Sequence, residues 1–360
     1  MRWAAVLLVA LPLMLLLLAA AAAITGNGDT ARNLWRGLRY LLAVELAFLL
    51  VMACVGAVYE ALSRSRERRL YQPPGQLVDI GGYRLHLNCS GKGGPTVVLD
   101  YGLEGSYLDW HRVQPEVARF TRVCSYDRGG YGWSDPSPNP RLPSVMVEEL
   151  HALLAKAGEK PPYIIVGHSF GGFDALMFAH KYREEVAGVV LVDGSHPDEL
   201  LPFYWRTRLW IRMMQFTMPL GLPRWRRWCG VGPPEIGPIK QAIGCRSQIY
   251  RTAYAQWMEF PQSADEIRGL GPLGDLPLVV IARDPERTPA DPSDEISPQR
   301  EQHWNKLQRE LVELSTNATY MVAKGSGHDV PNHRPDAVVY GVRRVVEKVS
   351  QDRQSSAQPG

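Results

Sequence analysis

The sequence predicts an α/β fold in which helices cover both faces of an eight-stranded, mostly parallel β-sheet, preceded by two transmembrane helices. Eight short β-rich runs alternate with helical patterns, and from the third run onward they are almost continuously apolar, as buried parallel strands are. The 360 residues, 45% of them hydrophobic, suffice for one large core. We therefore expect a membrane anchor in residues 1–69, one domain in 70–350 and a disordered tail in 351–360.

Both apolar segments of the anchor are long enough to cross a bilayer as helices. Residues 3–24 contain no charged side chain and residues 40–59 contain only Glu45, and about 20 apolar residues span the hydrocarbon core. The first segment can also be interpreted as a secretion signal, because Arg2, a leucine-rich middle and the Ala19–Ala23 run follow the order of such signals. We expect an uncleaved span.

Arginines flank the two segments unevenly. One precedes the first segment and four follow the second, whereas three lie between them, so the positive-inside rule predicts both termini in the cytoplasm. Residues 1–69 carry a net charge of +4, which leaves −1 of the formal +3 for residues 70–360. This near-neutral domain gives no indication of nucleic-acid binding, and the basic run at 64–69 is expected to contact anionic lipid.

The predicted strands follow a linker at 70–76, whose prolines end the second membrane helix. They are Leu77–Ile80, Tyr83–Asn88, Thr96–Asp100, Arg122–Tyr126, Tyr163–Val166, Gly188–Val192, Leu278–Ala282 and Thr319–Ala323. Helix signals lie between them: Ser144 precedes an amphipathic pattern that Gly158 closes, and Pro335 opens the last helix.

One long interval interrupts this alternation. About 80 residues separate the sixth and seventh predicted strands, and they hold five of the ten tryptophans. An insertion at this point, about 196–275, is expected to form a helical lid over the carboxyl edge of the sheet, where such folds bind ligands. Its aromatic residues have three interpretations: the core of the lid, the lining of a hydrophobic pocket, or contact with the membrane surface.

The five cysteines show no metal-ligand spacing, and we expect neither a metal nor a cofactor. Cys89 and Cys124 fall in predicted strands. A disulfide between Cys229 and Cys245 requires an oxidising compartment, so reduced and buried thiols are expected.

The stretch YIIVGHSFGGF at residues 163–173 is expected to carry the chemistry. An apolar strand stops, exposes one serine and restarts as a helix. A nucleophile on such a turn needs small residues two positions away on either side, because its backbone approaches the adjoining elements, and Gly167 and Gly171 meet this need. Ser169 is the predicted nucleophile, with the amide of Phe170 beside the reacting carbonyl oxygen.

A serine hydroxyl needs a base to remove its proton. Among nine histidines, His328 lies directly after the last predicted strand and before the last helix, where the chain returns to the sheet edge beside Ser169. We predict His328 as the base, with His333 as the competing position.

Between residues 76 and 349 the chain resembles the α/β-hydrolase superfamily, specifically its lidded bacterial serine-hydrolase branch. Five ordered motifs carry the resemblance: VVLDYGLEGSYLDW, SYDRGGYGWSD, YIIVGHSFGG, VVLVDGSHPD and LVELSTNATYMVAKGSGHDVPNHRPDAVV. The apolar N-terminal segments lie outside it. The resemblance implies a nucleophile at Ser169, a base at His328 and an oxyanion hole made by the amides of Phe170 and Leu103.

Two features depart from the pattern of that superfamily. The His-Gly pair that usually precedes the second oxyanion amide is Tyr101-Gly102 here. The acid partner of the base usually follows the seventh strand after a glycine, but LVVIARDPE has no such glycine and offers Asp284 or Glu286. Other members place the acid after the sixth strand, which matches Asp193. Asp193 is our first choice and Asp284 the second, since either position can reach a histidine.

The expected protein is a membrane-anchored serine hydrolase of the esterase or lipase type, which cleaves acyl bonds, preferably of apolar acyl groups, through a Ser-His-Asp triad and an acyl-enzyme. Serine at position 169 argues against the Asp-nucleophile chemistry of epoxide hydrolases and dehalogenases. Two alternatives stay open: an inactive ligand-binding module, and a carbon–carbon hydrolase or haloperoxidase with the same three residues. The expected partners are a small acyl substrate and membrane lipid, and the expected location is a bacterial inner membrane with the domain in the cytoplasm.

Overall fold

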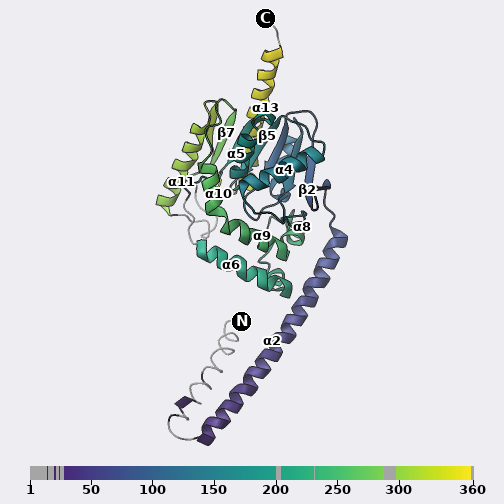
Figure 1. The fold of residues 1–360 in the computed structure, drawn as a ribbon, viewed down its shortest axis with the longest axis vertical. Helices are drawn as coiled ribbons and strands as arrows, with labels where there is room; N and C mark the ends of the chain where they lie inside the picture. The colour runs from purple at the N-terminus through teal and green to yellow at the C-terminus, as the bar shows by residue number, and fades with distance from the viewer. Residues whose placement is uncertain are drawn as a thin grey trace.

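The computed structural model describes residues 28–199, 204–230, 232–287 and 297–357, together with Met14, Ala20, Ala21 and Ile24. The first predicted membrane span, residues 3–24, lies outside the described residues apart from these four. The second predicted span, residues 40–59, lies within α2 (Gly28–Leu70), a helix of 43 residues that extends away from the domain (Figure 1). Within the described part of the chain, α2 alone is long and apolar enough to cross a membrane. The described residues therefore contain one candidate membrane helix, and the first predicted span is not tested.

The domain is built on one eight-stranded sheet in which every predicted strand is present. Its strands are β1 (Gln76–Asp79), β2 (Arg84–Ser90), β3 (Thr96–Asp100), β4 (Val123–Asp127), β5 (Tyr163–His168), β6 (Val186–Val192), β7 (Leu278–Arg283) and β8 (Ala318–Ala323). Their order is β1-β2-β4-β3-β5-β6-β7-β8. The β1–β2 and β2–β4 pairs are antiparallel and the other five pairs are parallel. The predicted mostly parallel sheet is confirmed.

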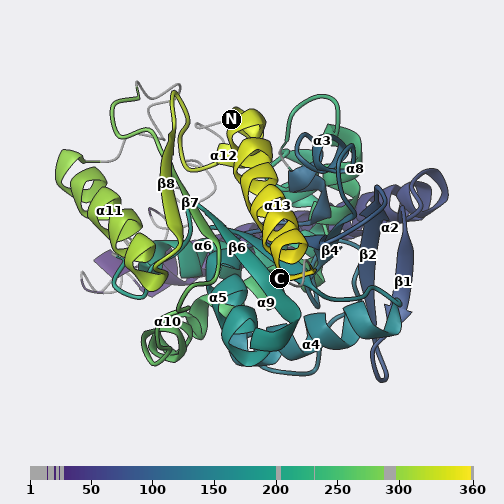
Figure 2. The same ribbon diagram turned by 90° about the horizontal axis from the view of Figure 1, so that it is seen from above.

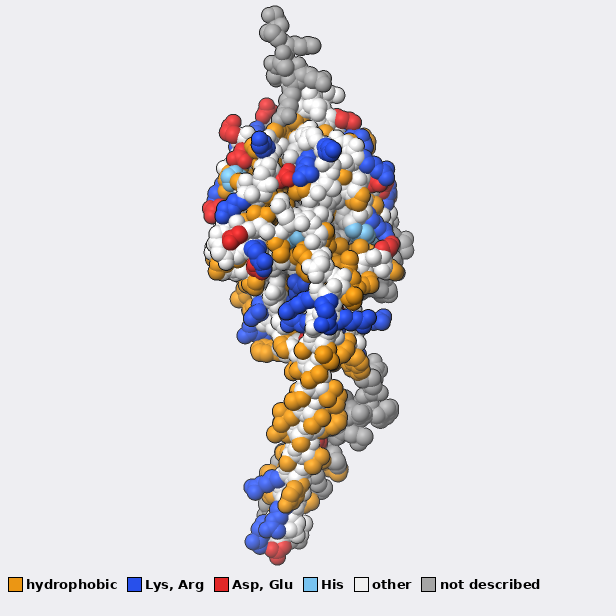
Figure 3. All heavy atoms as spheres, turned by 90° about the vertical axis from the view of Figure 1, so that its right-hand side faces the viewer, with side chains coloured by type: hydrophobic (Ala, Val, Ile, Leu, Met, Phe, Trp, Pro, Cys, Tyr) orange, Lys and Arg blue, Asp and Glu red, His pale blue; other side chains and the backbone are white. Residues whose placement is uncertain are grey.

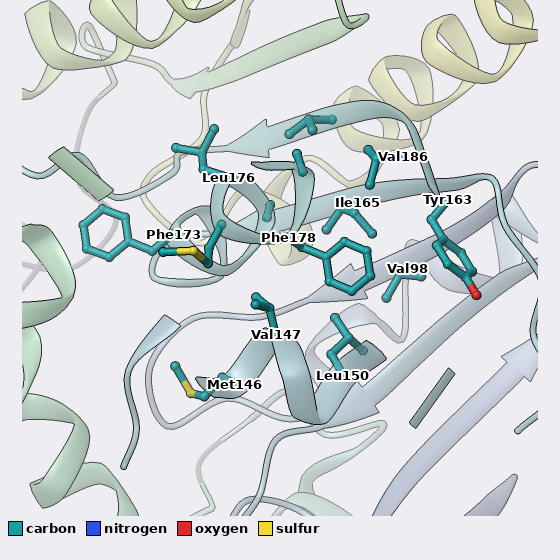
Figure 4. Packing of buried hydrophobic residues seen from close by; sticks show 14 of the residues in the cluster. Val98, Met146, Val147, Leu150, Tyr163, Ile165, Phe173, Leu176, Phe178 and Val186 are labelled. Carbon is teal, nitrogen blue, oxygen red and sulfur yellow. The ribbon is translucent and has the colours of Figure 1, made fainter. Parts of the chain in front are cut away.

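Helices cover both faces of this sheet (Figure 2). One face carries α3 (Gln114–Val117) and α13 (Pro335–Ala357), and the other carries α4 (Pro143–Lys156), α5 (Gly171–Lys181) and α10 (Phe260–Arg268). Strand β5 contributes side chains to the cores on both faces of the sheet. Tyr163 and Ile165 pack beneath α4 and α5 (Figure 4), whereas Ile164 and Val166 pack towards α13. This double burial explains why the central strands read as continuous apolar runs.

The predicted insertion between β6 and β7 is helical. It contains α6 (Tyr204–Thr217), the 3-10 helix η3 (Met218–Leu220), α7 (Leu222–Trp225), α8 (Gly237–Gly244), α9 (Ser247–Met258) and α10. Helix α6 lies at the end of the domain that α2 approaches (Figure 1). The remaining elements are η1 (Tyr107–Trp110), η2 (Arg183–Glu185), α11 (Pro298–Glu310), η5 (Leu311–Leu314) and α12 (Val330–His333).

Two disulfide bonds contradict the expectation of reduced thiols. Cys89 of β2 and Cys124 of β4 face each other in the antiparallel register and are bonded, and Cys229 is bonded to Cys245 within the helical insertion. The expectation was wrong for the first pair because β2 and β4 are neighbours in the sheet but not in the sequence. Among the described cysteines, the free one is Cys54, exposed on α2.

The C-terminal tail also differs from expectation. Helix α13 continues to Ala357, so residues 351–357 are helical instead of disordered. The reason lies in the sequence QDRQSSA, which contains no glycine or proline to end the helix before Pro359.

Candidate active site

Ser169 lies on a sharp turn between β5 and α5. Its φ of 52° falls in the left-handed region, where a residue with a side chain is strained. Close packing explains the turn: a Cβ added at Gly167 would clash with the carbonyl oxygen of Gly171, and a Cβ added at Gly171 would clash with that of Asp100. The glycines at both positions are therefore required for the turn that presents the Ser169 hydroxyl at the carboxyl edge of the sheet.

His328 and Asp193 reach Ser169 from the ends of other strands. Nε2 of His328 lies 2.9 Å from Oγ of Ser169, and Nδ1 of His328 lies 2.6 Å from Oδ2 of Asp193. Since a carboxylate accepts hydrogen bonds, Nδ1 carries the proton, and Nε2 is left to accept the proton of the serine hydroxyl. The structure thus joins one residue after β5, one after β6 and one after β8 in a continuous hydrogen-bonded line.

Asp284 lies elsewhere. Its carboxylate accepts hydrogen bonds from the amides of Gly325 at 2.8 Å and Glu286 at 3.0 Å, and it lies 3.6 Å from Nζ of Lys324. These contacts tie the turn after β7 to the turn after β8. Of the two predicted acids, the structure brings Asp193, and not Asp284, to the histidine. His333, the competing base, accepts a hydrogen bond from the amide of Gly327 at 3.3 Å.

Two residues that the sequence analysis did not single out hold Asp193. Nε1 of Trp304, on α11, donates to Oδ1 of Asp193 at 2.8 Å, and the amide of Arg283 donates to the same oxygen at 3.1 Å. The Arg283 guanidinium lies 3.5 Å from Oδ2. Complete burial alone would raise the pKa of Asp193, but the hydrogen bond from His328, the charge of Arg283 and the indole hydrogen bond hold it below its ordinary value. An arginine at the end of an apolar strand was the available signal for Arg283.

Two backbone amides near Ser169 are free to bind an anion. The amides of Phe170 and Leu103 donate no hydrogen bond within the described residues. Arg128 fixes the loop that carries the second amide, because its guanidinium donates to the carbonyl oxygens of Tyr101 at 2.7 Å and of Gly102. The C=O and N–H groups of a trans peptide point in opposite directions. The hydrogen bond from Arg128 to the Gly102 oxygen therefore orients the Leu103 N–H away from Arg128.

Arg128 is itself held by two buried carboxyl groups. Its guanidinium lies 3.1 Å from Asp174 and 3.8 Å from Asp100, and all three side chains are buried. Burial raises the pKa of both carboxyl groups, and the neighbouring Asp100 helps to raise that of Asp174 well above its usual range. The buried charge of Arg128 thus has acidic partners on two sides, as buried charges generally do.

His168, the residue before the serine, supports the loop of the base. Its Nε2 donates to the carbonyl oxygen of His328 at 2.8 Å. Burial, together with the charge of a protonated His328, lowers the pKa of His168 to about 4, so the ring is neutral at physiological pH. With Nε2 as the donor, Nδ1 is an acceptor, and it has no partner within the described residues.

A cavity of about 510 Å³ adjoins Ser169. Trp257 and Phe260 of the helical insertion and Trp304 of α11 contribute aromatic walls, and Leu103 and Tyr101 line it from the loop after β3. Three acidic residues, Glu104, Glu199 and Asp329, also line this space. The volume lies within the range of small-molecule sites.

Burial changes the charge of one of these acidic groups. It raises the pKa of Glu199 to about 7, and Glu199 receives a hydrogen bond of 3.4 Å from Ser195. Glu104 is exposed and receives a hydrogen bond of 3.4 Å from Trp257. Glu199 is therefore only partly ionised near neutral pH.

Comparison with known proteins agrees with the observed fold. A family model described as "alpha/beta hydrolase fold" matches residues 95–217, which run from β3 to the end of α6. A thermophilic esterase from Thermogutta terrifontis superimposes with a TM-score of 0.56 over 76% of this chain and 97% of that chain, at 22% identity. The chain has the α/β-hydrolase fold.

Two further proteins are similar to parts of this chain. The enol-lactonase from Burkholderia xenovorans LB400 covers 76% of this chain and 100% of its own, with a TM-score of 0.56 and 19% identity. The uncharacterized protein YbdG of Bacillus subtilis is 27% identical over 175 residues, 48% of this chain and 54% of that protein. The chain spans about half the length of the first curated relatives it matches, 54% and 43%.

Proposed function

We propose that this α/β-hydrolase-fold protein is a membrane-anchored serine hydrolase that cleaves esters through a covalent acyl-enzyme. The observation that carries the proposal is the pair of hydrogen bonds, 2.9 and 2.6 Å long, from Ser169 through His328 to Asp193. A histidine in this position removes the proton of the attacking hydroxyl, and a buried carboxylate stabilises the imidazolium that forms.

The proposed reaction has two acyl-transfer steps. Oγ of Ser169 attacks the ester carbonyl carbon while Nε2 of His328 takes the hydroxyl proton, and the carbonyl oxygen becomes an oxyanion facing the amides of Phe170 and Leu103. The tetrahedral intermediate then expels the alcohol, which receives the proton from His328. A water molecule, activated by the same histidine, attacks the acyl-enzyme and releases the carboxylic acid.

The proposed substrate is an ester with an apolar acyl group of moderate size. The aromatic walls from Trp257, Phe260 and Trp304 and the volume of about 510 Å³ favour such a group. The pKa of about 7 for Glu199 supports the same choice, because an uncharged carboxyl group opposes an apolar ligand less than a carboxylate does. Esterase and lactonase activity among structures of this fold is consistent with this class of substrate.

The orientation of the anchored domain needs a revised proposal. Disulfides persist in oxidising compartments and are rare in the cytosol, so the Cys89–Cys124 and Cys229–Cys245 bonds favour a domain outside the cytoplasm. The arginine counts in residues 1–69 favour the opposite side. We give the disulfides more weight, because they constrain the domain itself. A membrane-impermeant thiol reagent, applied to intact cells after reduction, should label the domain; protection until the membrane is broken would restore the cytoplasmic orientation.

Covalent labelling by a fluorophosphonate tests the catalytic proposal. Wild-type protein in membranes should react, Ser169→Ala should not, and His328→Ala should react far more slowly. The same assay distinguishes the two candidate acids: Asp193→Asn should reduce labelling, and Asp284→Asn should leave labelling close to that of wild type. Ser195→Ala is the matched control, because Ser195 lines the same cavity without a hydrogen bond to His328. Unlabelled, folded wild-type protein would overturn the proposal and favour a ligand-binding module.

A further inference from the structure

Exposed apolar side chains gather on one part of the helical insertion. Within the described domain beyond residue 70, ten large hydrophobic residues are exposed, and eight of them lie between 205 and 228. These eight are Trp205, Leu209, Trp210, Met213, Phe216, Leu220, Trp225 and Trp228. We call residues 204–228, which form α6, η3 and α7, the α6–α7 face. A concentration of this kind marks an interaction surface.

The α6–α7 face is also strongly basic. Its six arginines are Arg206, Arg208, Arg212, Arg224, Arg226 and Arg227, and it contains no aspartate or glutamate. Some of these arginines lie over aromatic rings: the Arg226 guanidinium is 5.2 Å from the ring centre of Trp228 and 5.9 Å from that of Trp225. Tryptophan and arginine together are typical of helices that lie in the headgroup region of a bilayer.

The position of α2 relative to this face identifies the partner. The backbone of Gly56, near the end of the apolar segment 40–59, packs against Leu220 and Gly221. Four residues further along α2, Glu60 pairs with the buried Arg224 at 2.7 Å, and Glu67 pairs with the same guanidinium. Figure 3 shows basic side chains gathered where the apolar part of α2 meets the domain. The α6–α7 face therefore lies at the level where α2 would leave the hydrocarbon.

We propose that the α6–α7 face docks on the headgroup region of an anionic bilayer, the same bilayer that α2 spans. Exposed tryptophan, leucine and phenylalanine side chains would enter the boundary between headgroups and acyl chains, and the five arginines other than the buried Arg224 would contact lipid phosphates. A second copy of this chain fits less well, because two faces that each present five arginines and no acid repel each other. The proposal rests on the membrane anchor of the proposed function but not on its chemistry.

Docking at this face would act on the cavity through a direct contact. Helix α6 packs against α9, which carries Trp257 of the cavity wall. A docked α6–α7 face is therefore expected to keep this wall of the cavity close to the lipid from which an apolar ester arrives.

Fluorescent labels on single cysteines test the docking. In a Cys54→Ala background, Leu209→Cys and Phe216→Cys report the face, Val51→Cys reports α2, and Met258→Cys is the matched control, since Met258 is an exposed apolar residue outside the face. Full-length protein is reconstituted in vesicles of phosphatidylglycerol and phosphatidylcholine that carry a nitroxide on the lipid headgroup. Quenching at positions 209 and 216 should exceed that at position 258 by about threefold or more. It should decrease in vesicles without phosphatidylglycerol.

The possible outcomes separate the two proposals. Lipid quenching at Val51→Cys without quenching at positions 209 and 216 overturns the docking and keeps the anchor. Absence of quenching at all three positions overturns the anchor as well. Cross-linking of Leu209→Cys between two molecules, without lipid quenching, assigns the face to a second copy and overturns the bilayer as its partner. Fluorophosphonate labelling of the same variants in detergent reports the catalytic proposal independently.

Discussion

Replacing Trp304 with phenylalanine would remove one hydrogen bond from a buried carboxylate and keep an aromatic ring in place. Oδ1 of Asp193 accepts from Trp304 at 2.8 Å and from the Arg283 amide at 3.1 Å, whereas Oδ2 accepts from His328 at 2.6 Å. A hydrogen bond to a charged group contributes about 1.5–3 kcal/mol. The free energy of unfolding of Trp304→Phe should therefore fall by about this amount at neutral pH, and the pKa of Asp193 should rise towards its ordinary value.

The pH dependence of this loss follows from the sign of the shift. The pKa of Asp193 is lowered in the folded protein, so the stability it contributes is present above the ordinary carboxyl pKa of about 3.9 and is lost as pH falls through the folded value. The difference between wild type and Trp304→Phe should be largest at neutral pH and should narrow below about pH 4.

Urea unfolding of the full chain in detergent, followed by circular dichroism, measures this difference. Trp257→Phe is the matched control, because Trp257 lines the same cavity but donates to Glu104 at 3.4 Å and not to Asp193. In an Asp193→Asn background the effect of Trp304→Phe should shrink to about 0.5–1.5 kcal/mol, the contribution of a neutral hydrogen bond. An undiminished effect in that background would refute the reasoning and assign the loss to packing of the indole ring.

Three further predictions concern the cavity, the oxyanion loop and the disulfides. Because the pKa of Glu199 is raised to about 7, this group gains charge as pH rises through 7, and KM for an apolar ester should rise with it; in Glu199→Gln this increase should be absent from the pH profile. Arg128→Lys keeps a charge but loses the hydrogen bonds to two carbonyl oxygens in the loop of Leu103. Because the oxyanion donor would then be misdirected, kcat should fall by about tenfold to a hundredfold with little change in KM. An unchanged kcat in a folded variant contradicts this role. Replacing Cys89 and Cys124 together with serine should lower the free energy of unfolding by about 2–4 kcal/mol. After reduction, which also breaks Cys229–Cys245, wild type and this variant should unfold at the same urea concentration.

The sheet could be predicted well from the sequence because strands that are buried on both faces require continuous apolar runs. The turn at Ser169 was equally readable, since the close approach of Gly171 to Asp100 leaves no room for a side chain. Sequence order also limited where a base could return to the sheet edge. These features depend on the local residue pattern and on the order of elements along the chain, and the sequence contains both.

The acid and its supports depend on contacts that no local pattern contains. Asp193 and Asp284 each follow an apolar strand, and only the turn after each strand decides which carboxylate faces the histidine. Trp304 comes from a polar helix 111 residues beyond Asp193, and neither its spacing nor its neighbours mark it. The Cys89–Cys124 bond could not be predicted for the same reason. Strands β2 and β4 are neighbours in the sheet, although β3 lies between them in the sequence.

In the proposed membrane-anchored hydrolase, the length of α2 sets how the domain can reach its substrate. The helix continues without a break from the apolar segment to Leu70, and at 1.5 Å per residue its 43 residues extend about 65 Å. The part beyond residue 59 adds about 16 Å to the hydrocarbon span, and the Arg224 pairs with Glu60 and Glu67 brace it against the domain. A rigid helix of this kind would fix the distance of Ser169 from the bilayer surface, whereas a flexible linker would not. An enzyme mounted in this way samples a thin layer along the bilayer by lateral diffusion, so its turnover would follow the surface density of a substrate more closely than its bulk concentration.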